Sequence, residues 1–260
     1  MAQTINTNIP ALTAQRNLSG SQLSMATAMQ RLSSGLRINS AKDDAAGLAI
    51  AERMNAQVRG MNVAIRNAND GISFAQTAEG GLNEIGSMLQ RMRELAVQSM
   101  NGTNSSGDRA NLNVEYTALA NEVKRISATT KFNNQSVLTG GASFSFQVGA
   151  NTGTNEQISV SAADASAASG VGSATGISIS TAASATDAIT ALDIGIGAIT
   201  TARATFGAVQ SRFQSAINNL QIGVENQAAA RGRIVDADFA VETAALTRSQ
   251  ILQQAGNAMV

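Results

Sequence analysis

Few side chains in this sequence could perform enzymatic chemistry, because the residue types that most often do so are missing. The chain contains neither His nor Cys, so it lacks the usual general base at neutral pH and any thiol nucleophile. The same absence excludes a disulfide framework and a zinc–thiolate site. Catalysis would have to use carboxylates, Lys or the single Tyr116. We therefore expect a protein that is not an enzyme and that uses no cofactor or metal.

Two short segments carry residues in patterns that could bind an ion. Lys42-Asp43-Asp44 places two carboxylates next to each other, but adjacent residues of a helix point in different directions. We interpret this segment as a charge cluster at the start of a helix. Gly170–Gly176 has glycines like those of a phosphate-binding loop, but it lacks the Gly-Lys-Ser ending and the helix that follows it. We interpret it as flexible filler.

The overall charge gives no reason to expect nucleic acid or a membrane as a partner. Eighteen basic residues balance eighteen acidic ones, so no net field attracts a polyanion or an anionic lipid surface. No segment approaches the roughly 18 uninterrupted apolar residues that favour a membrane span. The first ten residues lack a basic region followed by a long apolar run, so we expect no cleavable signal peptide.

Apolar residues recur at alternating steps of three and four in both halves of the chain, which is typical of helices that pack through a narrow seam. The pattern predicts helices over 45–99, 108–130 and 186–222, and the turn cluster Asn101–Gly107 separates the first two. The clearest seam positions are Met54, Val58, Met61, Ile65, Ala68, Ile72, Ala75, Leu82, Ile85, Leu89, Met92 and Ala96.

The middle of the chain has a different pattern. Apolar and polar residues alternate around the turn residues 149–153, which predicts a β-hairpin over 143–161. Residues 162–185 are almost all small, and we expect a flexible surface insertion. The many Ser and Thr residues of 161–190 could also accept O-linked sugar. The fold class is therefore mainly α, a long antiparallel helical bundle or coiled coil with a small β-hairpin region in the middle.

The terminal segments 1–44 and 226–260 are thin seams of Ala, Met, Leu and Ile, with too few large side chains to form a core as one pair. We therefore expect copies of the chain to cover them, although packing only within the chain is the alternative. A near-zero net charge permits such self-association. The terminal residues that we expect at a polymerisation interface are Leu18, Met25, Leu32, Leu36, Val241 and Ile251.

Several stretches resemble bacterial flagellin, and the resemblance extends over about 1–160 and 190–260. The stretches that carry it are Leu32–Ile50, Asn67–Gly80, Leu89–Gln98, Phe146–Asn151, Arg231–Ala240 and Ser249–Gly256. The resemblance implies that 1–44 and 226–260 are the two halves of an inner coiled-coil domain. It also implies that 45–225 is a rod domain and that the large outer domains of the family are nearly missing.

By the same resemblance the protein would polymerise with itself into an extracellular flagellar filament for motility, after type III export. Its other partners would be the flagellar cap, the hook–filament junction proteins and an export chaperone. Flagellins usually continue beyond the stretch that ends at Gly256, in a distal helix that is the main docking site for the chaperone. This sequence ends at Val260, so we expect a piece of a longer chain, the alternative being a naturally short variant with a thinner inner core. Chaperone docking on it is in doubt.

The resemblance further implies a surface that a flagellin-sensing Toll-like receptor recognises. The matching positions are Gln90, Arg91, Leu95 and Glu115, and Arg91 and Leu95 would also contact a neighbouring subunit. Receptor binding and polymerisation would then compete for one surface. The alternatives to a filament subunit are a hook–filament junction protein or another secreted helical structural protein. A metallopeptidase insertion, which some flagellins carry, is excluded by the absence of His.

Overall fold

The computed structural model describes residues 8–165 and 170–259, so parts of the predicted terminal segment and of the predicted insertion lie outside the described residues. The chain divides into two compact units. We call residues 1–59 with 223–260 the terminal unit, and residues 60–222 the central unit. The described helices are α1 (Ile9–Ser34), α2 (Ala45–Met100), α3 (Ser106–Thr129), α4 (Val171–Ala174), α5 (Ala182–Val235) and α6 (Phe239–Met259).

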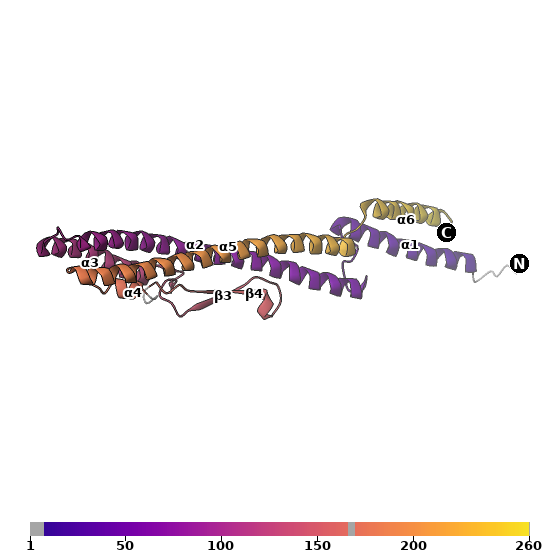
Figure 1. Cartoon of the computed structure of the whole chain (residues 1–260). Coiled ribbons are helices and arrows are strands. Elements are labelled where there is room, and N and C mark those ends of the chain that lie inside the picture. Colours follow the sequence, from indigo (N-terminus) through magenta and orange to yellow (C-terminus); the bar gives the residue numbers. More distant parts are fainter. Residues whose placement is uncertain (1–7, 166–169, 260) are drawn as a thin grey trace. The chain divides into compact units, whose positions relative to one another are not determined.

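The central unit is a helical bundle in which α2, α3 and α5 lie side by side (Figure 1). The predicted seam of α2 forms its core, because every seam position from Ala68 to Ala96 that the 3–4 pattern marks is at least half-buried. Gln210 of α5 donates to Glu79 of α2 over 2.9 Å. The expectation of a mainly helical bundle with a small β-hairpin region is confirmed.

Two small antiparallel sheets cover one part of the bundle. Strands β3 (Ser143–Gln147) and β4 (Gln157–Ser161) pair so that Phe144 lies opposite Val160 and Phe146 opposite Ile158. These four residues face the core, since the hairpin alternates inward and outward side chains. The ring of Phe74 in α2 lies 4.8 Å from that of Phe144 and 5.7 Å from that of Phe146.

The sequence did not predict the second, shorter hairpin. Strands β1 (Lys131–Phe132) and β2 (Gln135–Ser136) are joined by Asn133 and Asn134, whose φ angles are 46° and 64°. Two central residues with positive φ are typical of a two-residue hairpin turn, and Asn tolerates that conformation better than most residues. Asn-Asn is a weaker sequence signal than Asn-Gly, which is why the turn was missed.

The described part of the predicted insertion 162–185 is packed rather than flexible, so that expectation is wrong. Val171, Ala174 and Ile179 are buried in the core of the central unit. The hydroxyl of Tyr116 donates to the carbonyl of Ala174 over 2.7 Å, and the amide of Ile179 donates to Asn113 Oδ1 over 2.8 Å. Small residues let the backbone approach α3 closely, so hydrogen bonds and tight packing replace large side chains.

Two helix ends also differ from the prediction. Helix α1 ends at Ser34, because Gly35 adopts the left-handed conformation (φ 71°) and its amide donates to the carbonyl of Arg31. Leu36 therefore lies outside the helical seam, in a β-bridge with Asp236. Helix α5 continues to Val235 rather than ending at 222, so the C-terminal segment 226–260 contains the end of α5 and the separate helix α6.

Helix α5 is the one described helix that is long and apolar enough to cross a membrane, with a mean hydropathy of 1.3 in its most apolar window. A core helix of a helical bundle has the same composition. Phe206 and Phe213 of α5 are buried in the core of the central unit, so packing against α2 and the β3–β4 hairpin accounts for its apolar character.

Candidate assembly interface

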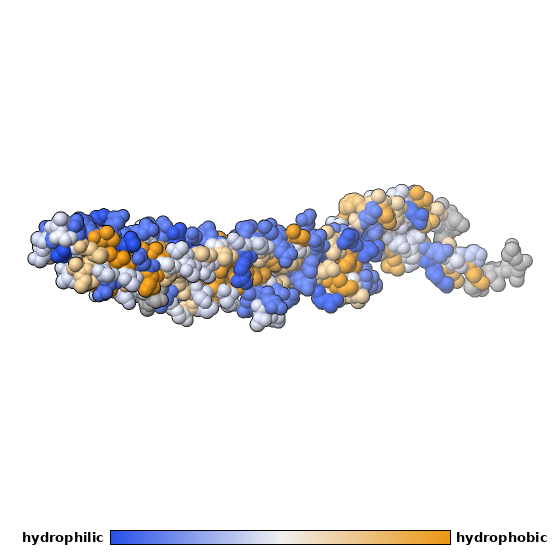
Figure 2. Space-filling model, viewed as in Figure 1, coloured by the Kyte–Doolittle hydropathy of each residue, from blue (hydrophilic) through white to orange (hydrophobic). Residues whose placement is uncertain are grey.

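The terminal unit exposes an unusual number of large apolar side chains. Helices α1 and α6 pack along each other (Figure 1), and of the described residues of α1 only Ala28 is buried. Apolar residues are visible over both helices in Figure 2. The exposed ones are Ile9, Leu12, Leu23 and Met29 of α1, and Phe239, Val241, Ile251 and Leu252 of α6.

The residues predicted for the polymerisation interface fall into two groups. Leu18, Met25 and Leu32 are half-buried, and Leu18 packs on α6, since a Cβ atom at Gly256 would lie 3.3 Å from its Cδ1. Val241 and Ile251 are 61% and 60% exposed. The seam of α1 therefore serves at least in part to pair the two helices within the chain, while Val241 and Ile251 are free to contact another molecule.

One face of α6 forms an open groove of about 600 Å³. Its apolar lining comes from Ala244, Ile251 and Leu252, and Thr243, Thr247 and Arg248 complete it. A shallow, mostly apolar groove with one cation at its side can accept the apolar ridge of another helix. It offers no enclosed cavity for a small molecule.

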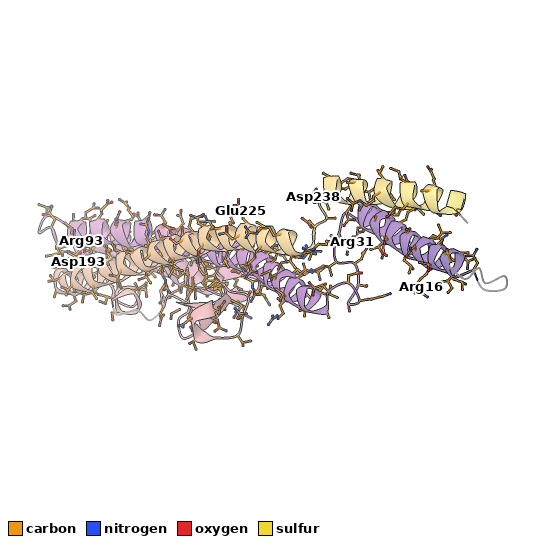
Figure 3. All side chains as sticks on the ribbon, turned by 90° about the vertical axis from the view of Figure 1, so that its right-hand side faces the viewer. Arg16, Arg31, Arg93, Asp193, Glu225 and Asp238 are labelled. Carbon is orange, nitrogen blue, oxygen red and sulfur yellow. The ribbon has the colours of Figure 1, made fainter. Side chains whose placement is uncertain are left out.

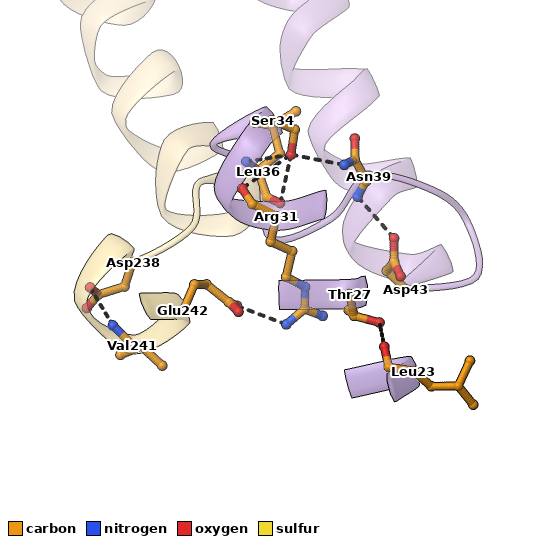
Figure 4. Close-up of polar contacts among 10 residues, drawn as sticks. All are labelled: Leu23, Thr27, Arg31, Ser34, Leu36, Asn39, Asp43, Asp238, Val241 and Glu242. Atoms are coloured by element: carbon orange, nitrogen blue, oxygen red, sulfur yellow. Dashed lines mark hydrogen bonds and ion pairs between the residues drawn. The ribbon is translucent and has the colours of Figure 1, made fainter. Parts of the chain in front are cut away.

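Polar contacts hold α1 and α6 together (Figure 4). Arg31 Nη1 donates to Glu242 Oε1 over 3.1 Å, and only 11% of the Glu242 side chain is exposed. Asp238 caps α6 by accepting hydrogen bonds from the amides of Ala240 and Val241. The backbone bridge adds two bonds, from the Arg37 amide to the Val235 carbonyl and from the Ala237 amide to the Gly35 carbonyl.

The segment Lys42-Asp43-Asp44 has the structural role expected of it. Helix α2 begins at Ala45, and Asp44 Oδ1 accepts a hydrogen bond from the amide of Gly47. The carboxylate of Asp43 accepts from the amides of Asn39 and Ser40, and these bonds lower its pKa below the ordinary value. Among residues 8–165 and 170–259, no group of three or more Asp and Glu residues could hold a metal ion.

The residues predicted for a receptor surface lie in the central unit. Gln90, Arg91 and Glu115 are exposed, and Arg91 forms a fork with Glu115, with Nη2 to Oε1 at 2.8 Å and Nε to Oε1 at 3.0 Å. The carboxylates of Glu94 and Glu115 raise the pKa of Arg91. Leu95 is only 1% exposed and belongs to the core. Its expected place on a surface is therefore wrong, because it points into the bundle.

A second exposed strip lies beside Arg91 on α2. Gln90, Arg93, Glu94, Val97 and Gln98 line an open groove of about 500 Å³. Arg93 Nε donates to Asp193 Oδ1 of α5 over 2.6 Å, and Figure 3 shows the two side chains next to each other. The sequence did not single out Arg93, although its place in the matching stretch Leu89–Gln98 was a possible signal.

The sequence also missed the exposed apolar residues of α1. Leu12 and Leu23 lie off the heptad positions of Leu18, Met25 and Leu32, whereas Met29 lies on the same side of the helix as Met25 and Leu32 and is still 53% exposed. The heptad pattern marks one seam on each terminal helix, whereas α1 carries a half-buried stripe and additional exposed apolar residues. The signal for these additional residues was the presence of large apolar residues beyond those that one partner helix can cover.

These features define a class of protein. The described residues form a bundle of long helices, and a thin helical pair exposes apolar side chains. This is a structural subunit built for helical self-assembly.

Comparisons with known proteins place the chain in a family. The bacterial flagellin N-terminal helical region matches residues 5–143, and the C-terminal helical region matches residues 189–260. A flagellin of Halalkalibacterium halodurans is 47% identical over 257 residues, which cover 98% of this chain and 94% of that protein. The chain belongs to the bacterial flagellins, and it is a structural subunit that polymerises into the extracellular flagellar filament.

Two further relatives describe the extent of the likeness. Flagellin D of Vibrio anguillarum is 35% identical over 362 aligned positions, which cover 100% of this chain and 96% of that protein. That alignment is longer than the 260 residues of this chain, so the Vibrio protein contains segments that are absent here. The crystal structure of Bacillus cereus flagellin matches with a TM-score of 0.53 at 32% identity, over 60% of this chain and 88% of that one.

Proposed function

We propose that residues 1–44 and 226–260 form the inner coiled-coil domain of the filament and that 45–225 form its rod domain. The division of the chain into a terminal and a central unit supports this assignment. The observation that carries it is the exposure of Leu23, Met29, Val241 and Ile251 on helices α1 and α6. Burying such side chains stabilises an assembly by about 1.5–3 kcal/mol each.

Within this proposal, subunits contact one another through the exposed apolar residues of α1 and the groove on α6. The half-buried residues Leu18, Met25 and Leu32 pair the two helices and position these surfaces. Because these residues and the groove form different surfaces, one subunit can offer the first while accepting a neighbour at the second. Such heterologous contacts generate open helical polymers.

The substitution Ile251→Glu tests the proposed interface. It adds a charge to the groove on α6 at an exposed position, so the monomer should keep its helicity. It should raise the subunit concentration needed for polymerisation by at least about 10-fold, because a buried apolar contact of roughly 1.5–3 kcal/mol is lost at every interface. Filament formation is measured by negative-stain microscopy after ammonium sulfate is added to purified monomer.

The matched control is Gln250→Glu, which adds the same charge to the neighbouring exposed residue of α6, outside the groove lining. The control should polymerise like the parent chain. If Ile251→Glu forms filaments at the same subunit concentration as the parent chain, α6 does not bind a neighbouring subunit through this groove. Equal loss in both variants would point to a general effect of charge on assembly and would also contradict the proposed interface.

We also propose that the surface formed by Gln90, Arg91 and Glu115 binds a flagellin-sensing Toll-like receptor and contacts a neighbouring subunit. The ion-pair fork between Arg91 and Glu115 supports this, since it holds an exposed cation in one geometry. Arg91→Ala removes exposed contacts only, so the fold should persist. It should weaken both receptor binding and polymerisation, and polymerisation at the parent level would show that the surface is not shared.

The remaining proposed partners are the flagellar cap, the hook–filament junction proteins and an export chaperone. Their common support is membership of the flagellin family. The protein has no catalytic role in this proposal. Its activity is assembly, and the groups that act are apolar side chains and ion pairs on helix surfaces.

A further inference from the structure

The turn between α2 and α3 contains the one Asn-Gly pair of the sequence, Asn101-Gly102. We propose that this pair is a site of spontaneous covalent modification, at which Asn101 loses its amide nitrogen and becomes aspartate or isoaspartate. The reaction needs a backbone amide nitrogen that is free to attack the side-chain carbonyl of the preceding Asn. The hydrogen bonds of the turn show that Gly102 offers such a nitrogen.

Asn101 and Gly102 are both exposed, and a Cβ atom added at Gly102 would meet no atom within 4 Å. The Gly102 amide donates none of the hydrogen bonds found among the described residues. The Asn101 side-chain amide group donates none either. The attacking nitrogen and the leaving amine are therefore both without a protein partner.

One contact of this turn favours the reaction directly. The amide of Thr103 donates to Asn101 Oδ1 over 3.4 Å. When the Gly102 nitrogen attacks Cγ of Asn101, negative charge develops on Oδ1, and an N–H group directed at that oxygen stabilises it.

The chemistry needs only water as a co-reactant. The Gly102 nitrogen loses its proton and forms a bond to Cγ of Asn101, the bond from Cγ to Nδ2 breaks, and ammonia leaves. Water then opens the cyclic imide. Attack at Cγ restores the normal backbone and gives aspartate, whereas attack at the main-chain carbonyl carbon gives isoaspartate, in which the backbone runs through the side chain. Both products carry one new negative charge.

Two other Asn residues in turns provide an internal comparison, since each precedes a Ser. The amide of Ser40, after Asn39, donates to Asp43 Oδ2 over 2.9 Å, and Asn39 Nδ2 donates to Ser34 Oγ. The amide of Ser105 donates to Asp108 Oδ2 over 3.0 Å. Asn104 Nδ2 donates to the carbonyl of Gln98 over 2.7 Å. In both turns, hydrogen bonds therefore engage the backbone nitrogen that would attack and the side-chain amine that would leave.

Modification would alter the local structure as well as the charge. The carbonyl of Asn101 accepts hydrogen bonds from the Asn104 amide and from Arg109 Nη2, each at 3.2 Å. Isoaspartate lengthens the backbone by one carbon atom at this point, so these bonds cannot all persist. Every subunit of a filament carries the turn, and the change would add charge repeatedly along the polymer as it ages.

The test is incubation of the purified full chain as monomer at mildly alkaline pH, followed by tryptic digestion and mass spectrometry. Asn101 and Asn104 fall in the peptide 94–109, where fragmentation separates them, and Asn39 falls in the peptide 38–42. We expect the mass increase of deamidation to accumulate first at Asn101, together with isoaspartate detected by enzymatic methylation. An unmodified Asn101, or equal rates at the three sites, would overturn the proposal.

Two variants test whether a backbone nitrogen free of hydrogen bonds determines the site of modification. Gly102→Ala fits the open space at this position and should slow modification of Asn101 without changing helicity. An unchanged rate would refute the role of the free Gly102 nitrogen. Asp108→Ala frees the Ser105 amide, so modification at Asn104 should rise several-fold while Asn101 keeps its rate. If Asn104 stays unmodified in that variant, a free attacking nitrogen is not sufficient for modification, and the proposed reason for the selectivity is wrong.

Discussion

The packing of α2 against α5 is tested by a pair of glycine substitutions in the same helix. Gly71 of α2 lies against the ring of Phe213, and a Cβ atom at Gly71 would come within 2.5 Å of Cζ and 2.8 Å of Cε2. Phe213 is fully buried, with its ring centroid 5.5 Å from that of Phe146. The ring therefore cannot move away without disturbing the β3–β4 hairpin. Gly80 of the same helix has no atom within 4 Å of an added Cβ.

Gly80→Ala should leave the central unit more stable than Gly71→Ala does. Replacing a helical Gly by Ala favours the helix by about 1 kcal/mol. Gly80→Ala has only this effect, so it should stabilise the central unit by about that amount. Gly71→Ala has the same gain, but overpacking costs about 1–3 kcal/mol. The helix-propensity gain is the same in both variants, so it cancels when their free energies of unfolding are compared. The remaining difference should be about 1–3 kcal/mol.

The assay is urea unfolding followed by circular dichroism, with the midpoint and the slope compared between variants. Gly71→Ala is also measured in a chain that carries the substitution Phe213→Leu. In that background Gly71→Ala should cost less, because the smaller side chain leaves room for the added methyl group, and the coupling should be about 0.5–3 kcal/mol. If Gly71→Ala stabilises the chain as much as Gly80→Ala does, α2 and α5 do not pack as described.

Two further predictions concern single contacts. Glu242→Ala removes the ion-pair partner of Arg31, whose Nε is already buried without a hydrogen-bond partner. The free energy that protects the α6 amides from exchange should therefore fall by about 1–3 kcal/mol. This loss is smaller than that for breaking a fully buried ion pair, because Arg31 is partly exposed. Hydrogen exchange of the α6 amides measures this, and unchanged exchange would contradict it. Burial raises the pKa of Tyr116 from 10.0 to about 12, so the stability that its neutral form contributes is complete below pH 10 and is lost as pH rises towards 12. Absorbance titration follows this group directly, since the chain has one Tyr and no Trp, and Tyr116→Phe should remove that loss, whereas a persistent loss would assign it to other groups.

The periodicity of the sequence predicted the helices well because it reports burial directly. The steps of three and four from Ala68 to Ala96 mark residues that the structure buries, and alternation located β3 and β4. The segment 162–185 was misjudged because its core contacts use small residues and backbone carbonyls, which leave no pattern of large side chains. Leu95 was misplaced because the resemblance gave a position in the sequence but not the face of the helix.

The two units bury their apolar side chains to different extents, and this difference supports the proposed role of the terminal unit in assembly. The central unit covers large residues such as Phe74, Tyr116 and Phe213 with its own helices and hairpins, so it needs no second copy to form a core. In the terminal unit Ala28 is the single buried residue of α1, while Leu23 of that helix is 69% exposed. A helix pair with so little internal burial gains most of its stability when other helices cover it. On the interface proposed above, assembly into the filament would also complete the core of the terminal unit. A surface substitution such as Ile251→Glu should then affect folding of α1 and α6 in the polymer more than in the monomer.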